Sequence, residues 1–403
     1  MIGALEGSVV TCAIGDVVDK VSSWDPQRAS GNSVFHYVDL SAVDQKAKTI
    51  IAPQRVRCSD APSRARQVLR AGDIVVSTVR PNLNSVAQVP PALDGATAST
   101  GFCVLRPRGG EVDGGYLFHW VKSPTFVAEM VRLATGASYP AVSDRIVRES
   151  RFPLLPLDEQ RRIAEVLDRA EALRAKRRAV LRKLDTLTPA IFVELFGDPV
   201  TNPKGWPETT TLGDVAEIAS GITKGRKLNG KATRLVSYLA VANVQDKALD
   251  LSVIKSIEAT EEEIERYRLE PDDLLLTEGG DPDKLGRGTL WNEELSECLH
   301  QNHIFRVRLQ SKQFEPLFLN WLVGSERGKR YFLRSAKQTT GIASINMAQL
   351  RRCPLLMPPL DLQREFARRV ASVENLKTVH RASLAELDAL FAALQHRAFR
   401  GEL

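Results

Sequence analysis

Hydrophobic residues recur at coiled-coil spacing in two long segments, residues 157–196 and 359–403. In the first segment apolar positions repeat every seven residues, and Arg177 interrupts them. They are Val166, Leu173, Val180 and Leu187, with Ile163, Ala170, Leu184 and Ile191 beside them. In the second segment the repeat is broken at His380 and comprises Phe366, Val373, Leu387 and Leu394, flanked by Val370, Leu384 and Phe391. Two such helices of equal length predict a coiled coil between them, and the alternative is two separate helices, each packed on its own domain.

The rest of the chain repeats itself at an offset of about 200 residues, in pattern more than in identity. The matched segments are 15–18 with 213–216, 37–40 with 238–241, 72–78 with 272–277, and 102–106 with 304–308. Each copy then has a helical segment with an aromatic face, a Thr-Gly loop and a proline-bounded strand. The sequence therefore predicts an α+β fold, in which two pseudo-repeated mixed α/β domains are joined by two long helices that form an antiparallel coiled coil.

These patterns divide the chain into four segments. We predict a first domain at 1–156, a first helix at 157–196, a linker with a second domain at 197–358, and a second helix at 359–403. Asp158 and Asp361 follow prolines at the two helix starts, where each is expected to be the N-cap. The linker is dense in Gly, Pro, Asn and Asp, which ends the first helix and turns the chain back.

Composition narrows the class of protein. With 403 residues, 43% of them hydrophobic, the chain can bury a sizeable core. Its net charge of +6 is compatible with phosphate contact without requiring it. The five cysteines form no Cys-x-x-Cys pair, which argues against a secreted disulfide framework and against a zinc ribbon. Because neither a signal-peptide pattern nor a membrane-span pattern occurs, we expect a cytoplasmic protein with no membrane association.

The motifs expected of a methyltransferase or an ATPase are incomplete. The nearest match to an adenine-methyltransferase signature, residues 202–205, lacks the second proline and the aromatic residue. Residues 324–330 resemble a phosphate-binding loop, but they are one residue short and lack the Ser or Thr that binds magnesium. Neither segment supports an enzymatic activity of this chain.

Nuclease and metal-site patterns are also incomplete. Asp272 and Glu278 resemble part of a nuclease core, yet glycines follow where its catalytic lysine is expected. Cys298, His300 and His303 would have to reach one ion from both faces of a strand. We therefore expect no catalytic residue and no metal site in this chain.

Three segments carry a resemblance to a known family. The two helix starts read Leu157-Asp158-Glu159-Gln160-Arg161 and Leu360-Asp361-Leu362-Gln363-Arg364, and the linker reads Phe-Gly-Asp-Pro-Val-Thr-Asn-Pro-Lys-Gly-Trp at 196–206. With the duplicated domains and the ending at 399–403, they resemble the specificity subunits of type I restriction-modification systems. The resemblance spans nearly the whole chain, although the two domains match only in outline.

The resemblance implies a non-catalytic subunit that recognises DNA. Each domain would recognise one half of a bipartite double-stranded target, and the helix pair would set the distance between the halves. Two methyltransferase subunits and two restriction/translocase subunits would be the partners, and these would bring S-adenosylmethionine, ATP and magnesium, so this chain needs no cofactor. Charged residues on the outer helix faces are the candidates for partner binding: Arg162, Glu165, Arg169, Arg174 and Arg178.

Candidate DNA contacts follow from chemistry, because base recognition needs donors and acceptors on exposed loops, and phosphate binding needs cations or backbone amides. In the first copy they are Arg80, Asn82, Asn84, Thr135, Gly136, Ser138 and Tyr139. In the second copy they are Lys224, Arg226, Lys227, Gln301, Asn302, His303, Thr340, Gly341, Ser344 and Asn346. The alternatives are an orphan or anti-restriction scaffold that binds methyltransferase subunits without recognising DNA, and a fused nuclease or methyltransferase.

Overall fold

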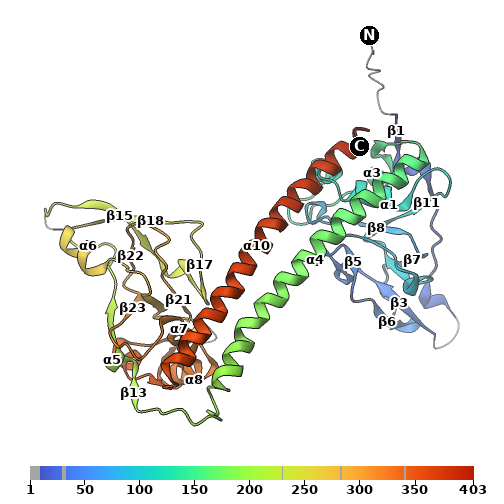
Figure 1. Cartoon of the computed structure of the whole chain (residues 1–403). Helices are drawn as coiled ribbons and strands as arrows, with labels where there is room; N and C mark the ends of the chain where they lie inside the picture. Colours follow the sequence, from blue (N-terminus) through green and yellow to red (C-terminus); the bar gives the residue numbers. More distant parts are fainter. Residues whose placement is uncertain (1–9, 30–32, 229, 282–283, 340–341) are drawn as a thin grey trace. The chain divides into compact units, whose positions relative to one another are not determined.

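The computed structural model describes residues 10–29, 33–228, 230–281, 284–339 and 342–403, and it divides into two compact units. Unit 1 extends to Ala179 and includes Arg381–Leu403, whereas unit 2 is Val180–His380. Two long helices, α4 (Leu157–Phe196) and α10 (Leu360–Ala398), each contribute one end to unit 1 and the other end to unit 2 (Figure 1). Within the described ranges, no helix combines the length and the apolar character of a membrane span.

Unit 1 contains two four-stranded sheets and three short helices. The central sheet has the order β2-β11-β8-β9 and is antiparallel, and the second sheet has the order β6-β3-β10-β7 with β3 parallel to β10. The strands are β1 (Thr11–Ala13), β2 (Val18–Asp19), β3 (Val34–Val38), β4 (Val43–Asp44), β5 (Thr49–Ile50), β6 (Gln54–Arg57), β7 (Ala65–Val68), β8 (Ile74–Ser77), β9 (Val86–Gln88), β10 (Thr97–Ser99), β11 (Phe102–Pro107) and β12 (Arg151–Pro153). The helices are α1 (Gly114–Val121), α2 (Pro124–Leu133) and α3 (Asp144–Glu149).

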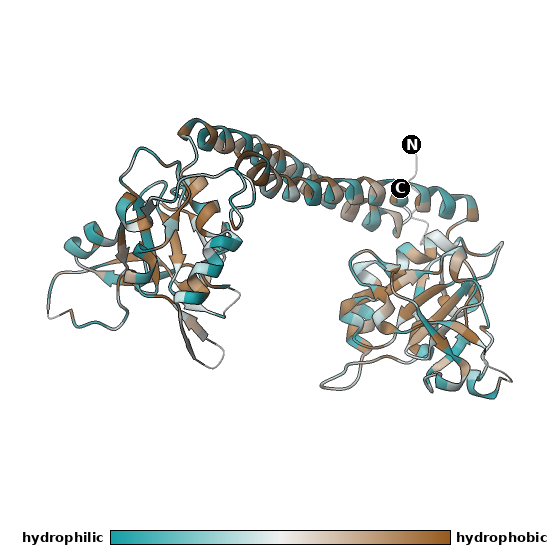
Figure 2. Ribbon diagram, turned by 90° about the horizontal axis from the view of Figure 1, so that it is seen from below, coloured by the Kyte–Doolittle hydropathy of each residue, from teal (hydrophilic) through white to brown (hydrophobic). Residues whose placement is uncertain are grey.

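The central sheet of unit 1 is buried on both faces. Ile74 and Val76 of β8 belong to the core shared with the helices, whereas Val75, between them, belongs to the core shared with the second sheet. Cys103 and Val104 of β11 alternate in the same way. Since successive strand residues point to opposite faces, both strands must be continuously apolar, and Figure 2 shows the strands largely in the hydrophobic colour.

Unit 2 repeats this architecture, which confirms the predicted pseudo-repeat. Its central sheet has the order β14-β23-β19-β21, and its second sheet has the order β18-β15-β22 with β15 parallel to β22. The strands are β13 (Thr210–Thr211), β14 (Ala216–Ser220), β15 (Arg234–Leu239), β16 (Val244–Gln245), β17 (Ala248–Leu249), β18 (Lys255–Ala259), β19 (Leu274–Thr277), β20 (Gly279–Gly280), β21 (Gly288–Leu290), β22 (Leu299–His300), β23 (Ile304–Leu309), β24 (Lys337–Thr339), β25 (Ile342–Ser344) and β26 (Pro354–Leu355). The helices are α5 (Leu212–Val215), α6 (Glu261–Tyr267), α7 (Pro316–Val323), α8 (Glu326–Ser335) and α9 (Met347–Arg351).

A buried ion pair recurs at the same place in both units. Asp73 accepts two hydrogen bonds from the Arg106 guanidinium at 2.9 and 2.7 Å, and Asp273 accepts two from Arg308 at 2.8 Å each. Both aspartates are 1% exposed and stand just before the central strand of their unit. Bidentate geometry satisfies both carboxylate oxygens, which offsets the cost of burying the charge.

The starts of the long helices differ from the prediction in one respect. Helix α4 begins at Leu157 and α10 at Leu360, so Asp158 and Asp361 lie in the first turn. Their negative charge interacts favourably with the helix dipole there, and neither is the N-cap.

The side chain that joins each helix start to its domain is the glutamine two residues after the aspartate. Gln160 accepts from Asp113 N at 2.8 Å and donates to Leu155 O at 2.8 Å, and the buried Gln363 makes the matching bonds with Glu315 N at 2.9 Å and Pro358 O at 2.8 Å.

The two long helices pack together in antiparallel orientation, as predicted. Arg178 of α4 pairs with Asp388 of α10 at 3.0 Å inside unit 1, and Asp185 pairs with Lys377 at 3.0 Å inside unit 2. Residue numbers thus rise along one helix as they fall along the other.

Burial along α10 confirms its predicted seam. For α4, one of the two predicted series of seam residues is wrong. The buried positions of α4 include Ile163, Leu167, Ala170 and Leu184, whereas Leu173 and Leu187 are 51% and 41% exposed. The seam alternates spacings of four and three residues from Ile163, so its second row is Leu167, Arg174, Leu181 and Thr188. The predicted row of Val166, Leu173, Val180 and Leu187 lies one residue away, because apolar side chains also occur outside the seam.

This assignment predicts a difference between two leucines three residues apart. Leu184→Ala should lower the free energy of unfolding by about 2–4 kcal/mol, because it leaves a cavity in the seam. Leu187→Ala, the matched control, should cost less than about 1 kcal/mol. Urea unfolding followed by far-UV circular dichroism measures both, and equal losses would show that the helices pair in the other register.

Candidate functional site

In both units the candidate loops gather where the central strands β8 and β19 end. Thr78 N donates to Gly101 O at 3.0 Å, and Glu278 N donates to His303 O at 3.0 Å. On the other side, Val142 N donates to Thr78 O and Ile345 N donates to Glu278 O, each at 2.9 Å. We call these loops the rims: rim 1 comprises 78–84, 100–101 and 135–142, and rim 2 comprises 222–228, 278–281, 301–303 and 342–345.

Rim 1 brings together two loops that are distant in the sequence. Arg80 N donates to Pro140 O at 2.7 Å, and the Arg80 guanidinium lies 4.7 Å from the centre of the Tyr139 ring. Tyr139 is 67% exposed, so the stacked pair faces solvent. Arg80 and Asn84 have φ angles of 50° and 45°, in the left-handed region, a conformation that non-glycine residues adopt mainly at functional sites and in tight turns.

The other candidates of rim 1 divide into exposed and internally bonded groups. Asn82 and Ser138 are exposed. Asn84 donates its side-chain amide to Lys122 O at 3.3 Å, so that amide is already used. Thr135 exchanges two backbone hydrogen bonds of 2.9 Å with Ala141, and Gly136 has a φ of 101°; together they shape the loop that carries Tyr139.

Rim 2 places the predicted basic loop beside the 301–303 turn, because Asn302 N donates to Ile222 O at 3.0 Å. Lys224 and Lys227 are exposed. The Arg226 guanidinium is already paired within the protein. Its Nε and Nη2 both donate to the Glu263 carboxylate, with Nη2 2.6 Å from Oε2. Nη2 also donates to Glu258 O at 2.7 Å. These hydrogen bonds from Arg226 lower the pKa of Glu263 to about 2.

The remaining candidates of the second copy fall in three places. Gln301 accepts from Val241 N at 3.4 Å, and His303 Nδ1 lies 2.6 Å from Glu278 Oε2. Ser344 pairs with Gly279 across strands β25 and β20. Asn346 is the N-cap of α9 and accepts from Gln349 N at 2.9 Å, which is a structural role. Thr340 and Gly341 lie outside the described residues.

Glu278 is a polar residue of rim 2 that the sequence did not single out as a DNA contact. In the sequence it is paired only with Asp272, in a pattern that resembles part of a nuclease core. Strand β19 separates the two, since Asp272 lies in the turn before the strand and Glu278 directly follows it. The signal that could have identified Glu278 is its position directly after the central strand, which it shares with Thr78.

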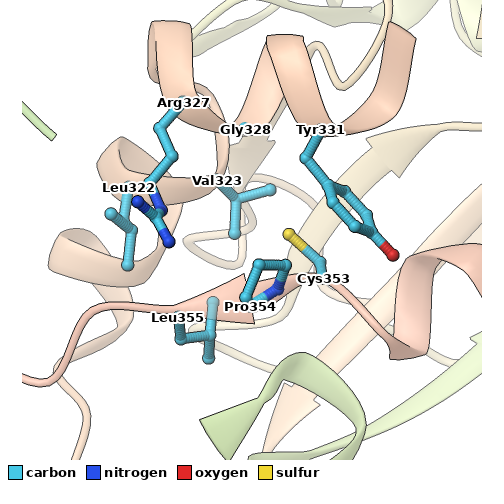
Figure 3. Close-up of a pocket in the computed structure, with 8 residues that line it drawn as sticks. All are labelled: Leu322, Val323, Arg327, Gly328, Tyr331, Cys353, Pro354 and Leu355. Atoms are coloured by element: carbon cyan, nitrogen blue, oxygen red, sulfur yellow. The ribbon is translucent and has the colours of Figure 1, made fainter. Parts of the chain in front are cut away.

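The segment resembling a phosphate-binding loop is the junction of α7 and α8 (Figure 3). Ser325 is the N-cap of α8, and a Cβ on Gly328 would lie 1.9 Å from Val323 O, so the glycine permits close packing of the two helices. Arg327 points toward the linker, donating to Pro199 O at 3.3 Å and pairing with Glu208. The segment thus has a packing role.

His119, Asp168 and Glu171 are the group of possible metal ligands among the described residues. His119 Nε2 lies 2.8 Å from Asp168 Oδ1, and Lys122 Nζ lies 2.6 Å from Glu171 Oε2. The lysine ammonium occupies the position where a cation would bind Glu171. We therefore assign these residues to the attachment of α1 to α4.

The candidate partner-binding residues of α4 have two different surroundings. Arg162 pairs with Glu159 and Arg169 lies 3.1 Å from Glu165, both within α4, and Arg162 also donates to Leu403 O. Arg174 and Arg178 instead pair with Asp388 of α10, and Arg174 also covers the Phe391 ring at 4.3 Å. These last two join the helices to each other.

Comparison with known proteins gives a consistent result. A family model described as the type I restriction modification DNA specificity domain matches residues 203–389. The chain is 25% identical over 319 residues to the StySPI type I restriction enzyme specificity subunit of Salmonella potsdam, which covers 75% of this chain and 68% of the relative. It is 24% identical over 321 residues to the EcoKI specificity subunit of Escherichia coli K12, with the same coverage.

A solved structure is similar to this chain along its full length. It is described in terms of complex assembly and conformational transition of the type I restriction-modification system, and it aligns over 100% of both chains with 25% identity and a TM-score of 0.64. The likeness therefore includes both units and both helices.

The pKa of Glu263 predicts a pH-dependent stability of rim 2. A lowered carboxyl pKa stabilises the fold above the pKa of the unfolded chain, 4.5, and this contribution is lost as the pH falls toward about 2. Glu263→Gln should therefore lower Tm at pH 7, and its deficit relative to the unmodified chain should shrink between pH 5 and pH 3. The control is Glu262→Gln, because this carboxylate is 83% exposed and lies 3.3 Å from Lys231. A deficit of Glu263→Gln that is independent of pH would contradict the ion-pair account.

Proposed function

This chain belongs to the family of type I restriction-modification specificity subunits, and we propose that it recognises a bipartite double-stranded DNA target with one rim for each half-site. The observation that carries the proposal is the duplicated rim, where the same backbone hydrogen bonds hold different side chains. A shared scaffold with different polar groups is what two different half-sequences require.

Rim 1 offers a base-recognising group of suitable chemistry. A guanidinium can donate two hydrogen bonds to the O6 and N7 atoms of guanine in the major groove. Tyr139 stacks on Arg80 and so reduces the side-chain entropy that Arg80 would lose on binding. Exposed Asn82 and Ser138 are placed to contact bases or phosphates beside it.

Rim 2 combines cations with base-recognising groups. Lys224 and Lys227 suit phosphate contacts, which position a protein on DNA without reading its sequence. Gln301, Asn302 and His303 supply amide and imidazole groups for base edges. Arg226 attaches the loop 222–228 to Glu263 of α6, so its proposed role is to keep that loop in place and not to contact DNA.

The paired helices are proposed to serve as both spacer and docking surface. Antiparallel ion pairs fix their register, so the length of the pair would set the gap between half-sites. Beside Arg162, Glu165 and Arg169, the helices carry exposed apolar side chains, which suit protein contacts: Leu173, Leu187, Val193, Leu376, Val379 and Leu390. Two methyltransferase subunits and two restriction/translocase subunits are the proposed partners, and they would contribute S-adenosylmethionine, ATP and magnesium to a chain without catalysis of its own.

Methylation by the assembled complex tests this function. The full chain would be combined with a type I methyltransferase subunit from the same organism, and methylated sites in genomic DNA would be sequenced. Sequence-specific methylation at a bipartite site supports the proposal. A stable complex that methylates no defined sequence would instead favour the orphan scaffold, and methylation by the isolated chain would favour an enzyme.

Substitution of Arg80 should change one half-site only. Arg80→Ala should relax one base pair of that half-site and weaken binding about tenfold or more, within the range of one bidentate base contact. Arg70→Ala serves as the control, because Arg70 is exposed and precedes β8, at the opposite end of that strand from the rim. Fluorescence anisotropy with oligonucleotides altered in either half-site measures the effect, and equal losses at both half-sites would refute the assignment.

Lengthening both helices should change the gap and not the half-sequences. Seven residues inserted after Arg177 and seven after Ala385, opposite it in the antiparallel pair, would keep both seams in phase. The added rise is about 10 Å, or about three base pairs. Sequencing of methylated sites should show a longer gap between unchanged halves, whereas five-residue insertions, which rotate the seam by about 140°, should destabilise the chain. Altered half-sequences with an unchanged gap would mean that the helices do not set the distance.

A further inference from the structure

Thr78 and Glu278 occupy the same position in the two units. The backbone of each is held on both sides, by residue 101 and residue 142 for Thr78 and by residue 303 and residue 345 for Glu278, with the same distances of 3.0 and 2.9 Å. The side chains differ completely. Thr78 is 7% exposed and donates its hydroxyl to Gly101 O at 2.9 Å, so it presents no free group.

Glu278 and its neighbour, in contrast, form a polar pair at the surface. His303 replaces the glycine of rim 1, and its Nδ1 lies 2.6 Å from Glu278 Oε2. The His303 side chain is 56% exposed and the Glu278 side chain is 34% exposed. At the same backbone position, unit 2 therefore has a solvent-exposed pair of polar side chains. In unit 1 the Thr78 hydroxyl is bonded to the Gly101 carbonyl and is not available to a ligand.

The pairing determines which hydrogen-bonding group the imidazole presents. An ionised carboxylate can only accept, so Nδ1 must carry the proton, and in a neutral imidazole Nε2 is then an acceptor. Asn302 Nδ2, a donor, lies 3.4 Å from Nε2 in the free chain, which agrees with that role; a base amine would replace this long contact at the single Nε2 lone pair. Glu278 thus orients the His303 ring and, in the neutral imidazole, selects the tautomer with the proton on Nδ1.

We propose that His303 Nε2, held by Glu278, accepts a hydrogen bond from an exocyclic base amine, adenine N6 or cytosine N4, in the half-site recognised by unit 2. This inference rests on the proposed function and names a base-contacting group, His303, and its positioning residue, Glu278. These amines are the major-groove donors of DNA bases, and an acceptor at this position discriminates against guanine O6 and thymine O4. Asn302, whose amide is both donor and acceptor, is placed to bind the neighbouring base edge.

The test uses the full chain assembled with its methyltransferase subunits. Glu278→Gln keeps the size of the side chain but lets it donate, which removes the constraint on the tautomer, and Glu278→Thr introduces the residue of unit 1. Both should relax one base pair of the second half-site and weaken binding to the unmodified target about tenfold. The first half-site and the gap should not change. Glu265→Gln, on α6 and 79% exposed, is the matched control and should behave like the unmodified chain.

Base analogues identify the amine. Hypoxanthine in place of adenine, or uracil in place of cytosine, replaces the amine by a carbonyl at a single position. One of the two substitutions should weaken binding of the unmodified chain about tenfold and have little effect on Glu278→Thr, and the base involved distinguishes adenine from cytosine.

Three results would overturn the inference. They are an unchanged target for both Glu278 variants, equal losses at both half-sites, which indicate a structural role, and analogue effects of equal size in the unmodified chain and the variants. Failure of the proposed function is separate, because then the unmodified complex would itself methylate no bipartite sequence.

Discussion

A buried glutamine ties each domain to its long helix, and the placement of the rims depends on it. Gln160 bonds the backbone before α1, the strand end before α4 and the segment at Glu111, so three pieces of chain meet at one amide. Gln363 does the same in unit 2 with Glu315, Pro358 and Gln313. Because both glutamines are 0% exposed, loss of any of these bonds leaves a buried polar group without a partner. The amide therefore ties the first turn of each long helix to the backbone of the domain that carries the rim.

Beyond this shared contact, both units hold their long helices by apolar packing, and unit 1 adds polar contacts to it. In unit 1 the helix α1 reaches α4 through polar groups, His119 with Asp168 and Lys122 with Glu171. In unit 2 aromatic rings take that place. Phe192 packs on Phe318, Trp321 and Phe366 with ring centres 5.5 to 6.1 Å apart. The unit 1 attachment therefore includes directional contacts that are sensitive to charge, whereas the aromatic contacts of unit 2 depend on burial.

The sequence was sufficient for features that repeat locally and insufficient for those that depend on distant contacts. Periodicity predicted both helices, the duplication and the whole seam of α10. It misplaced one row of the α4 seam, because Leu173 and Leu187 are apolar without being buried there. Residue types also predicted exposed donors in the rims. They could not show that Arg226 is held by Glu263, or that Arg80 meets Tyr139, since these contacts join loops that only the folded sheets bring together.

The rims are held by backbone hydrogen bonds, and this has a consequence for evolution. The bonds at Thr78 and Glu278 involve main-chain N–H and C=O groups that every residue except proline possesses. Exchange of the side chain at such a position changes the chemistry offered to a ligand while the main-chain bonds remain. New recognition can thus arise by single substitutions at little cost in stability, and the two copies can diverge independently from one ancestral scaffold.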